Sequence, residues 1–343
     1  MKMKGKLAIF LVFALAFGFA FYGGDGVQAA EYNIRAGIGF DDQSASYAGL
    51  QKFKDMVEDK SEGRIEVEIH PGAALGDDIE MMENLQRGVQ EVTVPSTAPI
   101  TGFVEDFAIF DLPFLIPNYE TADYILDGVI GQELLEQLED VGIIGVTYWE
   151  NGFRQLTNNE RPVESVEDME GLSIRTMENE IHLDAFEEMG ASPSPMAFGE
   201  LFSALEAGVV DGQENAFATI NFQHFYEVQQ YVTDTGHIYN PLVFMISEEF
   251  YNELPSDLQD VVIKSAEEAG IYQRELKRNM HEAAKEDLQD RDDTEVTVLT
   301  EEAREGFREA VEPVYENYEE QIGEEFIERV QNRIEEWQDI QDI

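Results

Sequence analysis

The chain alternates extended and helical segments, and this alternation limits the fold more than any other feature. The clearest example lies at residues 168–217. Apolar residues recur at every second position from Leu172 to Arg175, which predicts a short strand with one covered face. They then recur at every fourth position up to Gly190, which predicts a helix that ends in a glycine cap. Pro193 and Pro195 keep the next segment extended.

A second helix and a second strand complete this β-α-β unit. The helix is predicted from about Gly199 to Ala207, and the chain then returns to the sheet at Val209 and Val210. Arg175 and Asn215 would each follow the C-terminal end of a strand. Because ligands of open α/β sheets bind at that edge, both side chains are candidate ligand contacts.

Three further strands are predicted near the N-terminus, each separated from the next by a helical pattern. They cover Tyr32 to Ile38, Arg64 to His70 and Val92 to Val94. A β-α-β-α-β order predicts a parallel sheet with helices wound around it. The sequence therefore predicts an α/β fold.

Regular patterns continue through the rest of the chain. Helical segments are predicted at residues 119–138, 220–232, 256–290 and 301–338, and strands at 141–148, 242–247 and 296–299. The run Ser256-Asp257-Leu258-Gln259 has the spacing of a capping box at the start of the helix 256–290.

Arg175 differs in charge from its surroundings. Between Glu150 and Glu188 the chain has eleven acidic residues, no lysine and three arginines. An arginine at the end of an apolar strand requires a planar anionic partner. That partner is either a structural carboxylate, such as that of Glu178, or the carboxylate of a ligand, and the pattern alone leaves both open.

Five long segments carry a resemblance to a known family. They are HPGAALGDDIEMMENLQRG, YWENGFRQLTNNERPVESVEDMEGL, GLSIRT, GASPSPMAFGELFSALEAGVVDGQENAF and FYEVQQYVTDTGHIYNPLVFMIS. The chain resembles the solute-binding proteins of TRAP transporters, the DctP-type family, over nearly all of its length after residue 29. The resemblance implies an α/β two-domain periplasmic-binding-protein (flytrap) fold. Each domain would be a mostly parallel sheet flanked by helices, and one long helix would span both domains.

The same resemblance implies a division of the chain and a function. Residues 30–152 plus 241–280 would form domain I, and residues 153–240 plus 281–343 domain II, with hinges near Gly152, near Asn240 and inside the long helix. The protein would close over a small organic carboxylate and deliver it to the integral-membrane permease subunits of an ion-gradient-driven TRAP transporter. It would act as a monomer.

The resemblance also assigns roles to individual residues. Arg175 matches the arginine that grips the substrate carboxylate, and Arg154 matches a second arginine of the pocket. Asn215 matches an asparagine whose amide can donate to a carboxylate and accept from a hydroxyl. Phe198 matches a pocket aromatic, and His237 matches a histidine near the cleft. For each of the five the alternative is a structural role, as an ion pair, a surface arginine, a turn residue, a core residue or a hydrogen-bonded histidine.

Further candidates follow from their positions. Trp149 and Tyr148 precede the first hinge, and they either line the cleft or pack within a domain. Ser96, Thr97 and Gly39 follow predicted strands of domain I, where small side chains would form the floor of the pocket.

Two acidic residues belong to the same set. Glu178 stands where sialic-acid-binding relatives have an asparagine, which argues against a sialic acid ligand and leaves Glu178 itself a candidate contact. Asp78 faces the cleft in some relatives, although an acidic residue at a helix start is explained equally well by the helix dipole.

The first 29 residues have the pattern of a signal peptide. Three lysines precede an apolar run from Leu7 to Tyr22, and a small residue, Ala29, ends the segment. The alternative is an uncleaved membrane anchor, for which sixteen apolar residues are short. The chain has no cysteine, which excludes lipid attachment through cysteine and disulfide bonds. These features predict export to the periplasm.

Charge excludes one class of partner. The formal net charge is −50, and removal of the first 29 residues would make it 19 − 71 = −52. Nucleic acid is excluded as a partner because no basic stripe is present. Disorder is disfavoured by the regular apolar patterns. A solvated acidic surface adapted to high salt, as in a halophile with an acidic proteome, fits better.

No pattern indicates catalysis. The five histidines lack metal-ligand spacing, and no nucleophile elbow or phosphate loop is present. We therefore expect no enzyme activity, no cofactor and no metal. Two alternatives remain: a binding protein of the same fold that serves a sensor kinase or takes a compatible solute such as ectoine, and a secreted α/β hydrolase. Four-carbon dicarboxylates, 2-oxo acids and sugar acids all stay open as ligands.

Overall fold

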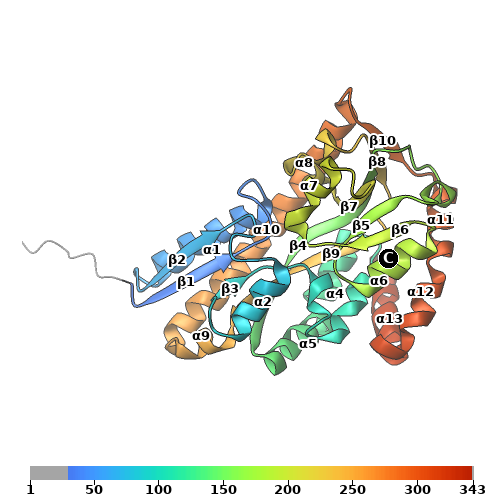
Figure 1. Ribbon diagram of the computed structural model, residues 1–343. Helices are drawn as coiled ribbons and strands as arrows, with labels where there is room; N and C mark the ends of the chain where they lie inside the picture. Colours follow the sequence, from blue (N-terminus) through green and yellow to red (C-terminus); the bar gives the residue numbers. More distant parts are fainter. Residues whose placement is uncertain (1–29, 342–343) are drawn as a thin grey trace, which may run out of the picture.

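In the computed structural model, which describes residues 30–341, the strands form one long sheet flanked by helices (Figure 1). The strand order is β2-β1-β3-β9-β4-β7-β5-β6, and β8 joins β10 to β4. The strands are β1 (Tyr32–Gly37), β2 (Ile65–His70), β3 (Val92–Thr93), β4 (Ile143–Asn158), β5 (Ser173–Thr176), β6 (Ser192–Pro195), β7 (Gly212–Ala216), β8 (Tyr231–Asp234), β9 (Tyr239–Ser247) and β10 (Glu295–Val298). The predicted signal peptide, residues 1–29, lies outside the described residues.

The α-helices follow the predicted alternation with the strands. They are α1 (Ala45–Lys60), α2 (Asp78–Gln86), α3 (Thr97–Ile100), α4 (Tyr119–Leu126), α5 (Val129–Gln137), α6 (Glu180–Glu188), α7 (Leu201–Glu206), α8 (Phe217–Phe222), α9 (Glu248–Glu253), α10 (Ser256–Asp290), α11 (Glu301–Ala310), α12 (Glu312–Tyr318) and α13 (Glu324–Gln341). Among the described residues no helix is both long and apolar enough to span a membrane.

At each end of the sheet the neighbouring strands are parallel. We call the end around β1, β2 and β3 the first lobe, and the end around β5, β6 and β7 the second lobe. In the first lobe β1 pairs in parallel with β2 and β3, and in the second β5 pairs in parallel with β6 and β7. The predicted β-α-β-α-β order at the N-terminus and the β-α-β unit around Arg175 are therefore confirmed.

Two antiparallel strands, β4 and β9, connect the lobes, and we call this pair of strands the crossing. They are paired from Ile143 opposite Ser247 to Phe153 opposite Tyr239, with register shifts in β4 after Gly145 and after Glu150. Beyond this pairing β4 continues into the second lobe and pairs with β7 and β8. One strand thus belongs to both lobes.

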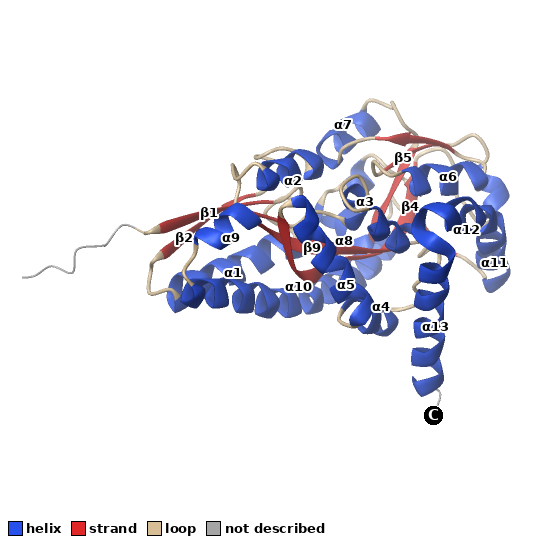
Figure 2. Ribbon diagram, turned by 90° about the horizontal axis from the view of Figure 1, so that it is seen from below, coloured by secondary structure: helices blue, strands red, loops and turns tan. Residues whose placement is uncertain are grey.

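The helix α10 is a single element of 35 residues, as the sequence predicts. It runs beside α1 on one face of the sheet and reaches the second lobe (Figure 2). Arg278 anchors it at the crossing, because its guanidinium bonds both Glu150 on β4 and Asp123 on α4 at 2.7 Å. The capping-box prediction is wrong, because Pro255 occupies the N-cap position and Ser256 is already helical.

Several predicted elements differ from the structure. The segment 119–138, predicted as one helix, is the two helices α4 and α5, and the strand predicted at 141–148 runs from Ile143 to Asn158. The strand expected at Val209 begins instead at Gly212, where a Cβ atom would lie 2.1 Å from the carbonyl oxygen of Thr157. The segment 220–232 is helical only to Phe222, since Tyr231 already starts β8. The predicted helix 301–338 is three helices with interruptions after residues 310 and 318.

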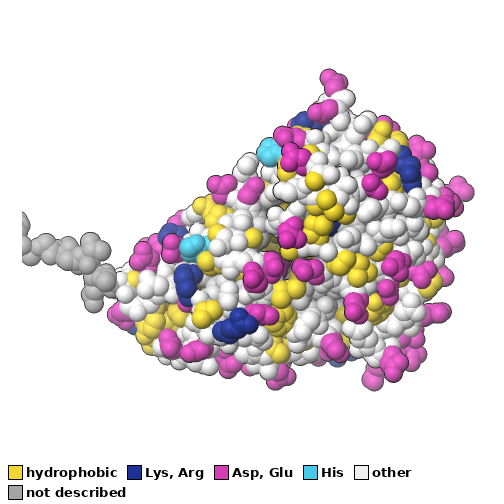
Figure 3. Space-filling view, viewed as in Figure 1, with side chains coloured by type: hydrophobic (Ala, Val, Ile, Leu, Met, Phe, Trp, Pro, Cys, Tyr) yellow, Lys and Arg dark blue, Asp and Glu magenta, His cyan; other side chains and the backbone are white. Residues whose placement is uncertain are grey.

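Acidic side chains cover both lobes on the face shown in Figure 3, with few lysines and arginines between them. Such a surface repels itself at low ionic strength. We predict that the melting temperature rises steeply from low to molar NaCl, because the Debye length falls to about 3 Å at 1 M salt. Differential scanning fluorimetry across a NaCl series measures this. A melting temperature that stays flat or falls would show that repulsion does not limit stability.

Candidate functional site

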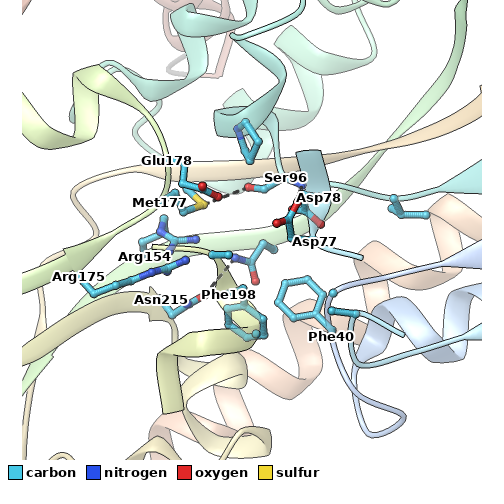
Figure 4. Close-up of a pocket in the computed structure, with 17 residues that line it drawn as sticks. Phe40, Asp77, Asp78, Ser96, Arg154, Arg175, Met177, Glu178, Phe198 and Asn215 are labelled. Atoms are coloured by element: carbon cyan, nitrogen blue, oxygen red, sulfur yellow. Dashed lines mark hydrogen bonds between the residues drawn. The ribbon is translucent and has the colours of Figure 1, made fainter. Parts of the chain in front are cut away.

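A pocket lies between the lobes, beside the β4–β9 crossing (Figure 4). It encloses about 630 Å³ of empty space, including the part open to solvent. The first lobe contributes Gly39, Phe40, Ala73, Asp77, Asp78, Val94, Ser96 and Pro99; β4 contributes Asn151 and Arg154; and the second lobe contributes Arg175, Met177, Glu178, Ala197, Phe198, Gly199 and Asn215.

Arg175 reaches the pocket from inside β5, one residue before the strand ends. Only 2% of it is exposed. Its Nε and Nη2 both donate to the carbonyl oxygen of Met196, at 2.9 and 2.5 Å, and these bonds fix the plane of the guanidinium. Nη1 is buried and has no hydrogen-bond partner among the described residues. Loss of hydration lowers the pKa of Arg175 to about 10, so it still carries a charge at neutral pH.

Arg154, from β4, is already paired inside the protein. Its guanidinium grips the carboxylate of Glu214 on β7 through Nε and Nη2, with Nη2 2.6 Å from Oε1. Burial opposes the charge on Glu214. The charge of Arg154, its hydrogen bonds and the nearby His237 ring outweigh burial and hold the Glu214 pKa well below its usual range. The pair is neutral as a whole, so Arg154 adds hydrogen-bonding geometry to the pocket and little net charge.

A single side-chain oxygen joins the two lobes at the back of the pocket. Oδ1 of Asn240, on β9, accepts from Ser96 Oγ at 2.8 Å, Asn151 Nδ2 at 3.1 Å and Arg154 Nη1 at 3.2 Å. Asn151 Nδ2 also donates to Asn215 Oδ1 at 3.3 Å. The first lobe, the crossing and the second lobe therefore share one polar network.

Two aromatic rings form one side of the pocket. Phe40 and Phe198 meet edge to face, with ring centroids 5.1 Å apart, one from each lobe. The ammonium of Lys277, on α10, lies 5.8 Å from the Phe40 ring centre and 5.3 Å from that of Phe222. Lys277 does not line the pocket, and loss of hydration lowers its pKa to about 7.

Three carboxylates face the same space. Asp77 caps α2 and Asp78 begins it, while Glu178 precedes α6 (Figure 4). An oxygen of Asp78 accepts from the backbone N–H of Ser96 at 3.2 Å, and loss of hydration raises its pKa to about 6. Loss of hydration also raises the pKa of Glu178, and no hydrogen bond to its side chain is formed by the described residues. Both groups are exposed enough to meet a ligand.

The structure brings most of the predicted site residues together. Arg175, Arg154, Asn215, Phe198, Ser96, Glu178, Gly39 and Asp78 all line the pocket. Two positions differ in detail. Arg175 and Asn215 lie within β5 and β7 rather than after their ends, because both strands continue one residue further.

Four predicted residues do not line the pocket. Trp149 is fully buried against α1 and α10, where Gly49 and Gly270 make room for the indole, since a Cβ on either would lie within 3 Å of it. Tyr148 is also a core residue and donates to the carbonyl of Gly131.

The other two lie one layer behind the pocket. Thr97 is buried behind Ser96 and accepts from Asn240 at 3.4 Å. His237 lies behind Glu214, with its Nε2 3.4 Å from the carboxylate. Both therefore support pocket side chains and contribute no surface to it.

Sequence reasoning did not single out several lining residues. Phe40, Asp77, Asn151 and Met177 are next to residues that were singled out, so a search around each candidate would have found them. Glu214 gives no such signal, because one carboxylate among 72 acidic residues is not conspicuous.

The lining of the pocket has the features of a binding site. Among residues 30–341 no group of three or more histidine, aspartate or glutamate side chains is placed to hold a metal ion. The pocket offers a buried arginine with a free donor, amide groups, aromatic faces and carboxylates. This set can hold an anionic group at one end and hydrogen-bond donors at the other.

Comparison with known proteins agrees with this geometry. The family model described as bacterial extracellular solute-binding protein, family 7 (DctP), matches residues 38–321. The C4-dicarboxylate-binding periplasmic protein DctP of Rhodobacter capsulatus is 33% identical over 283 residues, which are 82% of this chain and 85% of the relative.

Two solved structures are close in both fold and sequence. The sugar acid binding protein DctPAm from Advenella mimigardefordensis, in complex with galactonate, has a TM-score of 0.87 and 38% identity, over 90% of this chain and 99% of the other. A TRAP periplasmic solute binding protein from Polaromonas sp. JS666, bound to D-erythronate, has a TM-score of 0.84 and 36% identity, over 88% and 98%. The proteins of this group bind and transport solutes and are not enzymes. The chain belongs to the bacterial extracellular solute-binding proteins of family 7, the DctP family of TRAP transporter solute receptors.

Proposed function

We propose that this receptor binds a small organic carboxylate, with the carboxylate on Arg175. The observation that supports this most strongly is the buried Nη1 of Arg175, which lines the pocket and has no partner among the described residues. A ligand carboxylate would supply the missing acceptor and the missing charge. The galactonate and D-erythronate bound by two relatives are small acids of this kind.

A screen of about a hundred small acids in high salt tests this proposal. A ligand at a hundredfold excess over its dissociation constant stabilises the folded protein by about 2.7 kcal/mol, which a thermal shift detects. Hits would be confirmed by calorimetric titration. If no carboxylate among them binds the wild-type protein, the proposed function is wrong.

The two lobes support a closure mechanism. The pocket takes its walls from both lobes, and the segments that connect them are β4, β9 and α10, with Gly152 at a register shift in β4. We assign domain I to residues 30–152 plus 241–280 and domain II to residues 153–240 plus 281–343. A ligand that contacts both domains favours the closed state.

We predict that saturating ligand reduces the radius of gyration. The reason is that a ligand held by Arg175 from one side and by Asp78 or Ser96 from the other draws the lobes together. Small-angle scattering with and without ligand measures the change. The Arg175→Ala variant at the same ligand concentration is the control and should keep the larger value. Identical scattering for free and bound wild-type protein would exclude this mechanism.

We further propose the cellular setting. The family and the signal-peptide pattern of residues 1–29 support an exported periplasmic protein, and the absence of cysteine argues against lipid attachment through cysteine. We propose that it acts as a monomer. It would deliver its ligand to TRAP permease subunits in the membrane of an organism adapted to salt. Service to a sensor kinase is the alternative, and reconstituted uptake with the permease distinguishes the two.

A further inference from the structure

The charges that line the pocket are unevenly distributed. The cationic side chains among the described lining residues are Arg154 and Arg175, and Arg154 is neutralised by Glu214. One cation is therefore left for the ligand. Three carboxylates line the same pocket: those of Asp77 and Asp78 lie across it from Arg175, in the first lobe, and that of Glu178 lies beside Met177 in the second lobe (Figure 4).

This arrangement can balance the charge of one anionic group on the ligand. A ligand carboxylate on Arg175 would supply an acceptor for Nη1, because this atom is buried and has no hydrogen-bond partner among the described residues. A second carboxylate at the far end would meet like charges with no cation to balance them. Lys277 does not supply that cation, because it does not line the pocket and its ammonium donates to Thr219 Oγ1 at 2.9 Å.

The acidic groups instead offer acceptors. Asp78 has one oxygen engaged by the Ser96 N–H, and its other oxygen faces the space beside Gly39, 3.5 Å from where a Cβ would be. Ionised carboxylates accept hydrogen bonds and donate none, so they match hydroxyl groups on a ligand. The flanking rings of Phe40 and Phe198 suit the C–H faces of a carbon chain that carries such hydroxyls.

From these observations we infer that the ligand is a hydroxylated monocarboxylate, with its single carboxylate on Arg175 and its hydroxyl groups on Asp77, Asp78 and Glu178. This inference rests on the proposed function and narrows its ligand class. It excludes the dicarboxylates that a relative from Rhodobacter capsulatus is named for.

Matched pairs of acids test the inference. D-Galactonate and galactarate differ only in that the terminal hydroxymethyl of the first is a carboxylate in the second. D-Erythronate and meso-tartrate form the same pair with four carbons. We expect the monoacid of the better-binding pair to bind at least about 30-fold more tightly than its diacid at pH 8, which corresponds to about 2 kcal/mol. Calorimetric titration in high salt measures both constants.

Substitution of one of the three pocket carboxylates tests whether their charge causes the preference for a monoacid. Glu178→Gln keeps the size of the side chain and removes its charge, so the ratio between monoacid and diacid should fall about tenfold. Glu180→Gln removes an equal charge two residues away, outside the pocket lining, and should leave the ratio unchanged. An unchanged ratio in Glu178→Gln would show that the charge of the pocket carboxylates does not cause the preference for the monoacid.

The outcomes separate this inference from the proposed function. If galactarate binds more tightly than D-galactonate, or meso-tartrate more tightly than D-erythronate, the inference is wrong, but the proposed function as a carboxylate receptor still holds. Tighter binding of 4-aminobutyrate than of D-erythronate would show that the three pocket carboxylates select an ammonium group and not hydroxyl groups. This result would overturn the inference as well. Binding of none of these acids would contradict both.

Discussion

Replacement of Arg175 by alanine is expected to weaken ligand binding by about 30-fold to several thousandfold. The guanidinium is buried, its plane is set by two bonds to the Met196 carbonyl, its Nη1 has no hydrogen-bond partner among the described residues, and the residue lines the pocket. Removal of one partner from a buried charge pair costs about 2–5 kcal/mol, which gives this range of affinities. Arg175→Lys should also bind poorly, because an ammonium keeps the charge and loses the planar two-point grip.

Stability should change less than affinity in these variants. In the empty protein Arg175 is a buried cation whose charge is opposed by desolvation, so its loss removes an unfavourable term along with two hydrogen bonds. Arg161→Ala is the matched control, since Arg161 also donates to backbone carbonyls, those of Asp168 and Glu170, and does not line the pocket. Calorimetry and melting curves of all three variants decide the matter. Wild-type affinity with a lowered melting temperature in Arg175→Ala would make the arginine structural.

The second large effect concerns the Arg154–Glu214 pair. We expect Glu214→Gln to lower the free energy of unfolding by about 3–5 kcal/mol, because it leaves the buried guanidinium of Arg154 without a compensating charge. The depressed pKa of Glu214 means that its stabilising contribution is complete above the pKa of the unfolded state and is lost only as pH falls through the lower folded-state value. The deficit should therefore be constant across neutral pH.

Urea denaturation in molar salt measures this deficit. Glu227→Gln serves as the control, because Glu227 is exposed and its contact with His224, at 3.7 Å, is also exposed. The double variant Arg154→Met/Glu214→Met should recover most of the lost stability, since replacing both charges by apolar groups leaves neither one unpaired. A single variant as stable as the wild type, or a double variant less stable than the single one, would contradict this account.

Patterns of apolar residues predicted the parallel ends of the sheet and the helix α10, because each of these elements presents one regular face to the core. Arg175 was predictable from its contrast with an acidic background and from the resemblance. Trp149 was not, because the register shift after Glu150 decides which β4 side chains face the helices and which face the pocket, and a strand pattern carries no sign of a bulge.

Two other features depend on contacts distant in sequence. The start of β7 is set by close approach of Gly212 to the backbone of β4, and the exposed Val209, although a strong strand former, stays outside the sheet. The pairing of Arg154 with Glu214 joins residues sixty positions apart. Neither is visible in a local pattern.

The continuity of β4 through both lobes also limits how such a receptor can change its ligand. An inserted or deleted residue in this strand would turn every following side chain to the opposite face, moving Arg154 out of the pocket and Leu156 out of the core together. An insertion or deletion in β4 therefore changes the pocket and the core at the same time. Phe40, Asp77 and Glu178 line the pocket from segments outside the strands, so a substitution at any of them would change the pocket without shifting the register of the sheet. New ligand preferences are therefore accessible by single substitutions in these segments, while Arg154 and the polar network around it are inherited unchanged with the scaffold.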